Sequence, residues 1–419
     1  MKRLLILLAA FLPLSLFAQS SEHEALVADI RENVHRVCIT TDPYEYIPGP
    51  QTPAPKGYKP FYISHYGRHG ARSNWNSNGH YEDLSERYHK AYEAGLLTPV
   101  GIAAMRQVDT IIVLHDGMDG RLTPLGAQEH RQIAHRMYVN YKDVFKKGSK
   151  KITARSSVVP RVLVSMAAFT GELLSLQGDL DVSLDTGEKI MKIMSTDETR
   201  DVRDSVSNYA HRLSQQHAYA KEDFMLKVFT DTSDVRSVVG SITRLMKDTY
   251  AAAATCPAFG LDDRLFDLFT LDDLVFFEQR NAVRLYMRQC NSIDFGDKRM
   301  KPVELIVRDI MEKADAAIAT GAVAADFRFG HDYHLLATSS RLGFAGVAER
   351  RTFENCIDWP GWRYTPFAGN FQLIFYRGRK GDVLVKVLLN ERETAILGLE
   401  GFPYYKWEDV RALWSSYLK

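Results

Sequence analysis

A histidine set between two arginines carries the strongest chemical signal in this chain. The run GRHGAR, residues 67–72, places Arg68 and Arg72 on either side of His69. Guanidinium groups bind phosphate oxygens through a planar fork of N–H donors, and cationic neighbours disfavour the protonated form of a nearby imidazole. The run therefore predicts a phosphate-binding loop in which His69 is a neutral nucleophile. Because short motifs also occur by chance, a solvated basic turn is the alternative.

Two further segments place polar side chains directly after apolar stretches. His331 and Asp332 follow the run ADFRFG, although a helix-capping aspartate beside an uninvolved histidine would explain this pair on its own. Arg155 opens the run RSSVVPR, which ends at Arg161 and also follows an apolar stretch. A surface arginine is the alternative interpretation of that segment. Each pair is a weak signal when taken alone.

Strand and helix signals alternate around these segments. Apolar stretches predict strands at residues 61–66, 151–155, 325–329, 370–376 and 382–389. Capping residues predict helix starts at Thr123 and Thr270, and Gly321 is placed to end a helix that opens at Pro302. Ligands of α/β sheets bind at the carboxyl ends of strands. We therefore expect an α/β core that is split by a largely helical insertion, with the site just beyond the strand ends.

The composition is that of a soluble globular protein. Of 419 residues, 45% are hydrophobic and 25% are charged, which argues against a disordered, collagen-like or multi-span membrane protein. The formal net charge of +1 gives no reason to expect nucleic acid or an anionic membrane as a partner. Residues 1–20 combine Lys2 and Arg3 with a short apolar stretch and Ala18, which predicts a cleaved signal peptide. We expect a periplasmic or extracellular protein without a membrane span.

The four cysteines do not predict a metal site. They lie far apart without CxxC spacing, at Cys38, Cys256, Cys290 and Cys356. Export would permit disulfides in any of three connectivities, and free buried thiols are the alternative. His331 and His334 also lack an accompanying HExxH motif or cysteine–histidine set. We therefore expect no metal.

Taken together, the three segments resemble the histidine acid phosphatase family, in clade 2 of the histidine phosphatase superfamily. This family includes acid phosphatases, phytases and multiple inositol polyphosphate phosphatases. The resemblance is carried by RHGAR from Arg68 and by HD at 331–332, with support from LTPLGAQEH, ARSSVVPRVLVSMAAF, TPFAGN and VLLNE. It implies a phosphoglycerate mutase-like three-layer α/β/α sandwich with a mostly helical cap. We expect the core over residues 21–176 and 322–419, and the cap over residues 177–321.

The resemblance also implies a role for each residue of the predicted site. His69 would take the phosphoryl group, and Asp332 would donate a proton to the leaving oxygen. The phosphate oxygens would be bound by Arg68, Arg72, Arg161 and His331. No cofactor is implied. Ser73 and Asn74 replace the usual RHGxRxP continuation, and HDY stands where inositol polyphosphate phosphatases have HAE.

The expected activity is hydrolysis of small-molecule phosphate monoesters, including inositol polyphosphates such as phytate, through a phosphohistidine. A broad-specificity acid phosphatase acting on sugar phosphates or nucleotides is the alternative, and a phosphotransferase, a mutase or a non-catalytic phosphate-binding module is a further one. Basic residues that could meet a polyphosphorylated substrate are Lys189, Lys192, Arg200 and Arg203. Acidic neighbours favour a solvated helix face for these four side chains.

Overall fold

The structure is a computed structural model that describes residues 21–74, 81–194 and 200–418. The predicted signal peptide, residues 1–20, lies outside these ranges. Within them, no helix combines the length and the apolar character that crossing a membrane would need.

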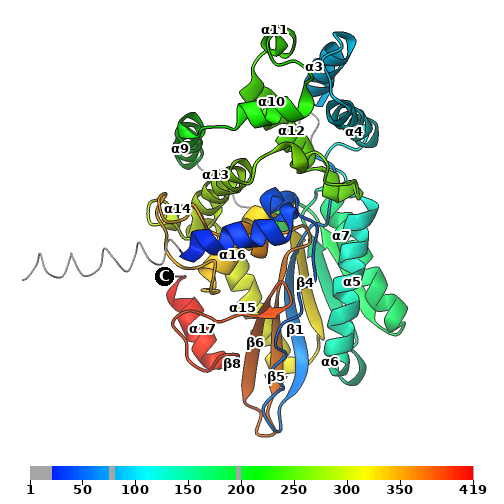
Figure 1. Ribbon diagram of the computed structural model, residues 1–419. Coiled ribbons are helices and arrows are strands. Elements are labelled where there is room, and N and C mark those ends of the chain that lie inside the picture. The colour runs from blue at the N-terminus through cyan, green and yellow to red at the C-terminus, as the bar shows by residue number, and fades with distance from the viewer. Residues whose placement is uncertain (1–20, 75–80, 195–199, 419) are drawn as a thin grey trace, which may run out of the picture.

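A mixed sheet of eight strands lies at the centre of the molecule (Figure 1). The strands are β1 (Lys59–Arg68), β2 (Lys151–Ser156), β3 (Asp181–Thr186), β4 (Ala325–Gly330), β5 (Asn370–Arg377), β6 (Val383–Leu389), β7 (Arg392–Glu393) and β8 (Tyr404–Lys406). Their order is β3-β2-β4-β1-β5-β6-β7, with β8 paired to β6. Strands β3, β2, β4 and β1 run parallel, and β5 and β6 join antiparallel. The parallel half therefore brings the carboxyl ends of these four strands to one edge.

Helices cover both faces of the sheet. One face holds α5 (Pro124–Asn140), α6 (Lys142–Lys147) and α7 (Pro160–Leu176), and the other holds α8 (Glu188–Met194), α15 (Glu304–Thr320), α16 (Asp332–Arg341) and α17 (Trp407–Ser416). A hydrophobic core lies on each face of the sheet, because successive side chains of β1 point to opposite faces. Ile63 packs with α5–α7, while Tyr62 and Tyr66 pack with α15 and α16. The expected α/β/α sandwich is confirmed, and the predicted strands lie within β1, β2, β4, β5 and β6 apart from a one-residue difference at the start of β6.

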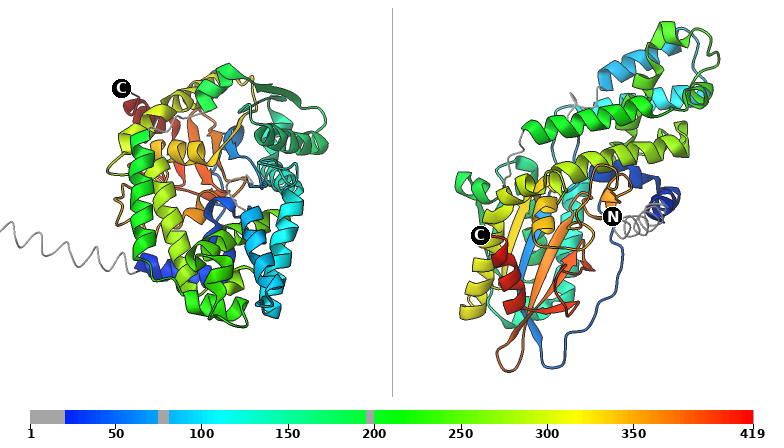
Figure 2. Two further views of the ribbon diagram at one scale, coloured as in Figure 1. Left: turned by 90° about the horizontal axis from the view of Figure 1, so that it is seen from above. Right: turned by 90° about the vertical axis from the view of Figure 1, so that its left-hand side faces the viewer.

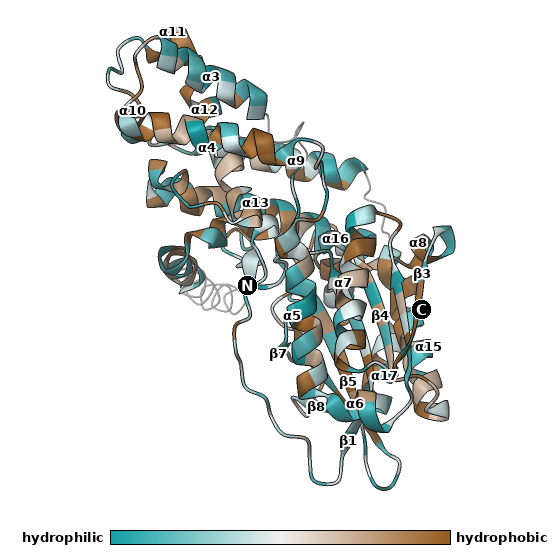
Figure 3. Cartoon of the chain, turned by 90° about the vertical axis from the view of Figure 1, so that its right-hand side faces the viewer, coloured by the Kyte–Doolittle hydropathy of each residue, from teal (hydrophilic) through white to brown (hydrophobic). Residues whose placement is uncertain are grey.

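A separate hydrophobic cluster forms a helical lobe beyond one end of the sheet (Figures 1 and 2). The lobe contains α3 (Tyr81–Glu93), α4 (Pro99–His115), α10 (Lys221–Val228), α11 (Val235–Val239), α12 (Ile242–Ala253) and α13 (Leu271–Gln289), and α9 (Arg200–Gln216) lies against α13. Apolar residues, brown in Figure 3, occur in α10, α12 and α13.

The packing groups the chain differently from the predicted cap, residues 177–321. Tyr88 of α3 and Val108 of α4 share one core with Phe224 and Leu245, so the lobe also uses helices that precede the insertion. Strand β3 and helix α15 lie inside 177–321 but pack in the sandwich. The division into core and cap at those boundaries stays a prediction.

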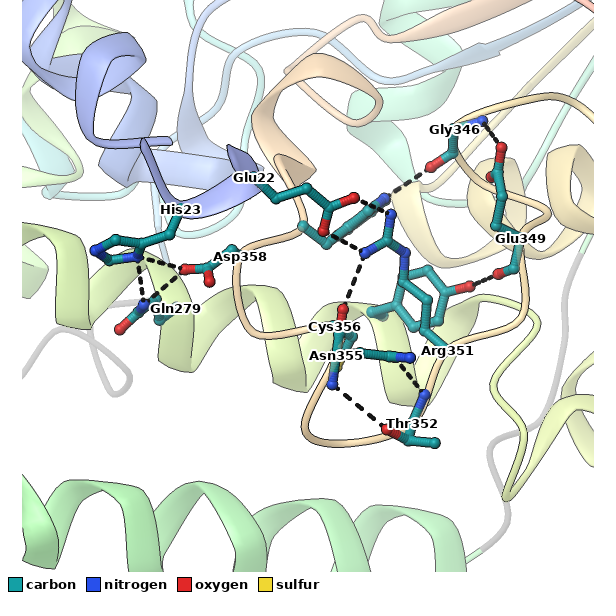
Figure 4. Close-up of polar contacts among 12 residues, drawn as sticks. Glu22, His23, Gln279, Gly346, Glu349, Arg351, Thr352, Asn355, Cys356 and Asp358 are labelled. Carbon is teal, nitrogen blue, oxygen red and sulfur yellow. Dashed lines mark hydrogen bonds and ion pairs between the residues drawn. The ribbon is translucent and has the colours of Figure 1, made fainter. Parts of the chain in front are cut away.

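The first described segment is a helix over residues 21–32 that is fastened to loops near the sheet end (Figure 4). Glu22 forms a two-armed ion pair with Arg351, at 2.8 and 2.9 Å. His23 Nδ1 lies 3.0 Å from the Asp358 carboxylate, which also accepts a 2.7 Å hydrogen bond from Gln279 of α13. These contacts anchor the first turn of the helix, which is followed by η1 (Val34–Thr41), where the Thr40 carbonyl contacts the candidate site.

All four cysteines are buried free thiols, as the second alternative from the sequence proposed. Burial raises the pKa of each thiol above its ordinary value. Protonated buried thiols are unreactive packing groups.

Glu278 on α13 is a buried carboxyl group that lowers the stability of the fold by an amount that depends on pH. Its exposed fraction is 0%, and neither carboxyl oxygen has a hydrogen-bond partner among the described residues. Burial, with a smaller contribution from the Asp42 carboxylate, raises the pKa of Glu278 well above its ordinary value. The unfolded chain therefore releases this proton at lower pH than the folded protein, and folding stability falls as the pH rises above the ordinary glutamate value.

We expect Glu278→Gln to remove this cost, because glutamine stays neutral at every pH. The advantage of the variant in free energy of unfolding should grow by about 1.4 kcal/mol for each pH unit within the window between the two pKa values. Melting temperatures measured from pH 4 to pH 8 check this, with the exposed Glu312→Gln as control. A difference that does not change with pH would show that Glu278 does not titrate as described.

Candidate active site

Three strand ends bring the predicted segments together. Arg68, the last residue of β1, pairs with Gly330, the last residue of β4, and Ser156 at the end of β2 pairs with Phe329. The loops that leave these strands carry His69 and His331, and lead into the first turn of α7. The sheet register therefore places side chains that are hundreds of residues apart in sequence at one edge.

Close backbone packing holds the loop after β1. A Cβ atom on Gly70 would lie only 2.2 Å from the carbonyl oxygen of Gly126 at the start of α5, so no other residue fits. The Gly70 N–H donates to Ser165 Oγ at 3.1 Å, and the Ala71 N–H donates to the buried Glu129 carboxyl at 2.7 Å. Burial raises the pKa of Glu129 to about 7. Sequence reasoning gave no role to Ser165 or Glu129.

His69 is a buried imidazole whose tautomer is set by one hydrogen bond. Its exposed fraction is 2%, and its Nδ1 lies 2.9 Å from the Gly70 carbonyl oxygen. Because a carbonyl oxygen can only accept, Nδ1 carries the proton and Nε2 keeps the free lone pair. Burial, followed by the charges of Arg68 and Arg161, lowers the pKa of His69 well below its ordinary value.

Three arginines surround this imidazole. Arg68 donates to the carbonyl oxygens of Thr365, at 2.7 Å, and Thr40, at 2.6 Å, and its guanidinium lies 3.6 Å from the Asp332 carboxylate. Burial and the field of Arg72 lower the pKa of Arg68 to about 10.

Arg161, the second residue of α7, completes the cationic group. Burial and the fields of Arg72 and Arg68 lower its pKa to about 10. The three guanidinium groups thus repel one another, and the Asp332 carboxylate offsets part of this repulsion. An added anion such as phosphate would relieve this repulsion.

His331 and Asp332 close the opposite side. The His331 ring lies 5.6 Å from the His69 ring, its Nε2 is 3.2 Å from Ser157 Oγ, and it stacks on Tyr333. Burial and the charge of Arg161 lower the pKa of His331 to about 4.

Asp332 begins α16, with a side-chain exposed fraction of 26%. Its Oδ1 accepts the Tyr333 N–H at 2.9 Å. Burial would raise the pKa of Asp332, but Arg68 and then His331 outweigh burial and hold it below its ordinary value. Held by these neighbours, this carboxyl is therefore ionised.

Other residues singled out from sequence lie elsewhere. Arg155 forms a buried ion pair with Asp309 at 2.6 Å, which also binds Arg328, so it is neither a site residue nor a surface arginine. His334 packs against Tyr66, and no group of three or more possible metal ligands occurs in the described ranges. Exposed positions are occupied by Lys189, Lys192, Arg200 and Arg203.

A cavity of about 400 Å³ adjoins the Asp332 side of this cluster. Its walls come from η1, α12, α13 and the start of α16. Lining residues include Thr40, Asn74, Asn281, Arg284, Arg288 and Asp332. His69 and its arginines lie beside this cavity, and Arg68 contacts two of its lining residues, Thr40 and Asp332. Arg284 and Arg288 of α13 were not singled out from the sequence, although their four-residue spacing places them on one side of a helix.

Sequence and structure comparisons agree with this geometry. Residues 67–258 match the sequence model of the histidine phosphatase superfamily (branch 2). No curated protein matches the chain. The fold is similar to the multiple inositol polyphosphate phosphatase of Bifidobacterium longum in complex with phosphate, with a TM-score of 0.73 and 17% identity over 92% of this chain and 98% of that one.

Two further structures share the fold. The same Bifidobacterium longum enzyme in complex with inositol hexasulfate has a TM-score of 0.67 and 18% identity, over 92% of this chain and 98% of that one. The phytase from D. castellii has a TM-score of 0.60 and 14% identity, over 92% of this chain and 86% of that one. The segment that carries His69 is thus similar to branch 2 of the histidine phosphatase superfamily, and the whole chain shares the fold of these phosphatases.

Proposed function

We propose that this chain is an exported phosphomonoesterase that hydrolyses phosphate esters through a phosphohistidine at position 69. The observation that carries the proposal is the His69 imidazole, whose Nδ1–H is held by the Gly70 carbonyl so that Nε2 faces outward as a lone pair among three guanidinium groups. A phosphate monoester carries roughly −1.5 to −2 charges at neutral pH, which suits that cationic setting.

In the first step, Nε2 of His69 attacks phosphorus while the bond from phosphorus to the ester oxygen breaks. Arg68, Arg72 and Arg161, together with His331, stabilise the charge on the equatorial oxygens. Asp332 gives its proton to the departing oxygen. The incoming phosphate offsets the arginine fields that hold this carboxyl ionised, so substrate binding itself favours the protonated acid.

In the second step, water attacks the phosphohistidine and inorganic phosphate leaves. Asp332, now a carboxylate, accepts a proton from that water, and His69 regains its free Nε2. Each group thus returns to its starting state after one turnover.

Inositol polyphosphates are the substrate class we propose. The structural neighbour from Bifidobacterium longum is named a multiple inositol polyphosphate phosphatase and was solved with inositol hexasulfate, and its fold matches 92% of this chain. A broad-specificity acid phosphatase acting on sugar phosphates or nucleotides is the alternative.

Phosphate release from phytate, a sugar phosphate and an aryl phosphate tests the proposal on the mature protein. Release from all three esters supports the phosphomonoesterase, and a higher kcat/KM for phytate supports the substrate class. Similar values for all three esters would favour the broad-specificity alternative. No release from any ester would overturn the proposed function.

We expect activity to persist in acid because His69 remains neutral there. An imidazole with the ordinary pKa near 6.5 would lose about tenfold in reactive form for each pH unit below it, whereas the lowered pKa of His69 delays that loss. After allowance for ionisation of the ester, kcat/KM for an aryl phosphate should change less than about threefold from pH 7 to pH 5. A tenfold fall per unit below pH 6.5, or a rate that keeps climbing above pH 9, would contradict the scheme.

A further inference from the structure

His115, the last residue of α4, is a buried histidine with both ring nitrogens in hydrogen bonds. Its exposed fraction is 4%, and its ring packs against the rings of Tyr81 and Phe259, each with its centre 4.9 Å away. Nδ1 lies 2.8 Å from the carbonyl oxygen of Ile111, which can only accept, so Nδ1 carries the proton. Nε2 therefore keeps its lone pair, and it accepts the backbone N–H of Asn74 at 3.1 Å.

The peptide group between Ser73 and Asn74 connects this histidine to the candidate site. The carbonyl oxygen of that group, on Ser73, accepts a 2.8 Å hydrogen bond from Nη1 of Arg72. Because a peptide group is planar and rigid, the bond from its N–H to His115 also fixes where its carbonyl oxygen lies. His115 thus determines the position of the acceptor that holds the Arg72 guanidinium.

Ser73 is bound on its other side by the loop before α5. Its exposed fraction is 0%, its N–H donates to the Arg121 carbonyl oxygen at 3.0 Å, and its Oγ accepts the Arg121 N–H at 3.1 Å. These bonds do not fix the rotation of the peptide group that follows Ser73. Asn74 stands where the family motif usually has proline, which has no N–H to donate. The bond to His115 is therefore one that the usual motif cannot form.

The hydrogen bond that His115 accepts requires a neutral imidazole, because a protonated ring has no lone pair. Burial lowers the pKa of His115 below its ordinary value. The Ile111 carbonyl, Asp119 and Glu82 act in the opposite direction, and the charge of Arg72 acts with burial. The combined effect of these groups favours the neutral ring.

We infer that His115 is a positioning residue, which orients the Ser73–Asn74 peptide so that Arg72 is held for binding the phosphate oxygens of the substrate. The inference rests on the proposed function, in which Arg72 stabilises the transferred phosphoryl group. Arg72 belongs to the cationic group of the site, because after burial its charge does most to lower the pKa of Arg161.

The test removes the acceptor and keeps an aromatic ring. For His115→Phe, kcat/KM for an aryl phosphate and the calorimetric affinity for inorganic phosphate should each fall about tenfold, the effect of leaving one buried N–H without its partner. His115→Gln, whose side-chain carbonyl can accept the same N–H, should recover most of both. His217→Phe is the matched control, since it removes a half-buried histidine that stacks on Phe276 of α13, and it should leave both values unchanged.

A double-mutant cycle shows whether His115 acts through Arg72. In an Arg72→Ala background, His115→Phe should lower kcat/KM by less than about twofold further, because the guanidinium that it positions is absent. A tenfold loss in both backgrounds would mean that His115 supports the fold in general and would overturn the inference. No loss from His115→Phe alone, or a His115→Gln variant no better than His115→Phe, would overturn it as well.

A measurement on the wild type decides the point even if a variant does not fold. Nitrogen NMR spectra should show His115 as the neutral Nδ1–H tautomer, and an Nε2–H tautomer would overturn the inference. If the wild type releases phosphate from no ester, the proposed function fails. The tautomer and the phosphate affinities would then still show whether His115 positions Arg72.

Discussion

Replacing His69 by alanine should abolish phosphate release from every ester, with a loss of at least about 10⁴-fold in kcat. In the proposed mechanism the imidazole forms the covalent bond to phosphorus, and no other described nucleophile occupies its place. His331, the nearest imidazole, has its ring centre 5.6 Å away and its Nε2 beside Ser157 Oγ. The arginines remain in the variant, but they stabilise charge and cannot replace the bond.

The measurement pairs turnover with trapping of the intermediate. Wild type quenched during hydrolysis of a labelled ester should retain a covalent phosphoryl group, and His69→Ala should retain none. The variant should still bind inorganic phosphate, because Arg68 is held independently by the carbonyl oxygens of Thr40 and Thr365. Exposed His89→Ala serves as the control for loss of a histidine. Turnover by His69→Ala within tenfold of wild type would remove the nucleophile from the scheme.

The segments of the candidate site could be located from the sequence because each lies directly beyond a strand with a clear apolar signal. β1 and β4 are recognisable from FYISHY and ADFRF, so the positions of His69 and His331 at strand ends followed from local patterns. That these ends share one edge depends on strand order, which is set by long-range pairing that local periodicity does not encode.

Partners supplied by remote backbone were beyond sequence reasoning. Arg68 is held by carbonyl oxygens 28 and 297 positions away, and a backbone carbonyl has no residue-type signature. Arg155 is the converse case, in which a local pattern like that of Arg68 does not indicate where the side chain lies. It lies at the end of a strand as Arg68 does, yet its guanidinium pairs with Asp309 of α15, on the second face of the sheet.

The helices that share the core of the lobe could not be grouped from the sequence for a similar reason. Helices α3 and α4 precede the insertion, and their apolar faces match those of α10 and α12 only in three dimensions. The basic residues that the sequence offered as substrate contacts, such as Arg203 beside Asp204, are exposed to solvent. Arg284 and Arg288 line the cavity instead. Basic composition alone did not distinguish the two sets, because the side of a helix that faces a cavity depends on its neighbours.

Asp332→Asn should affect the two chemical steps differently, depending on the leaving group of the ester. Asparagine cannot donate a proton to an alkoxide, so kcat for an alkyl phosphate such as a sugar phosphate should fall about 10²- to 10⁴-fold. An aryl phosphate with an acidic phenol leaves without help, so its first step should be much less affected. Asparagine also cannot accept the proton of the attacking water, and labelled phosphoenzyme should therefore accumulate with the aryl ester.

Rapid-quench measurement of phosphoenzyme and released phenol distinguishes a loss of proton transfer from a structural defect. A burst of phenol followed by slow phosphate release is the expected signature, since formation of the intermediate would then outrun its hydrolysis. Asp332→Glu keeps a carboxyl group and should regain part of the activity on the alkyl ester. Equal losses on alkyl and aryl esters without accumulated phosphoenzyme would mean that Asp332 acts by holding Arg68, 3.6 Å away, and not by moving a proton.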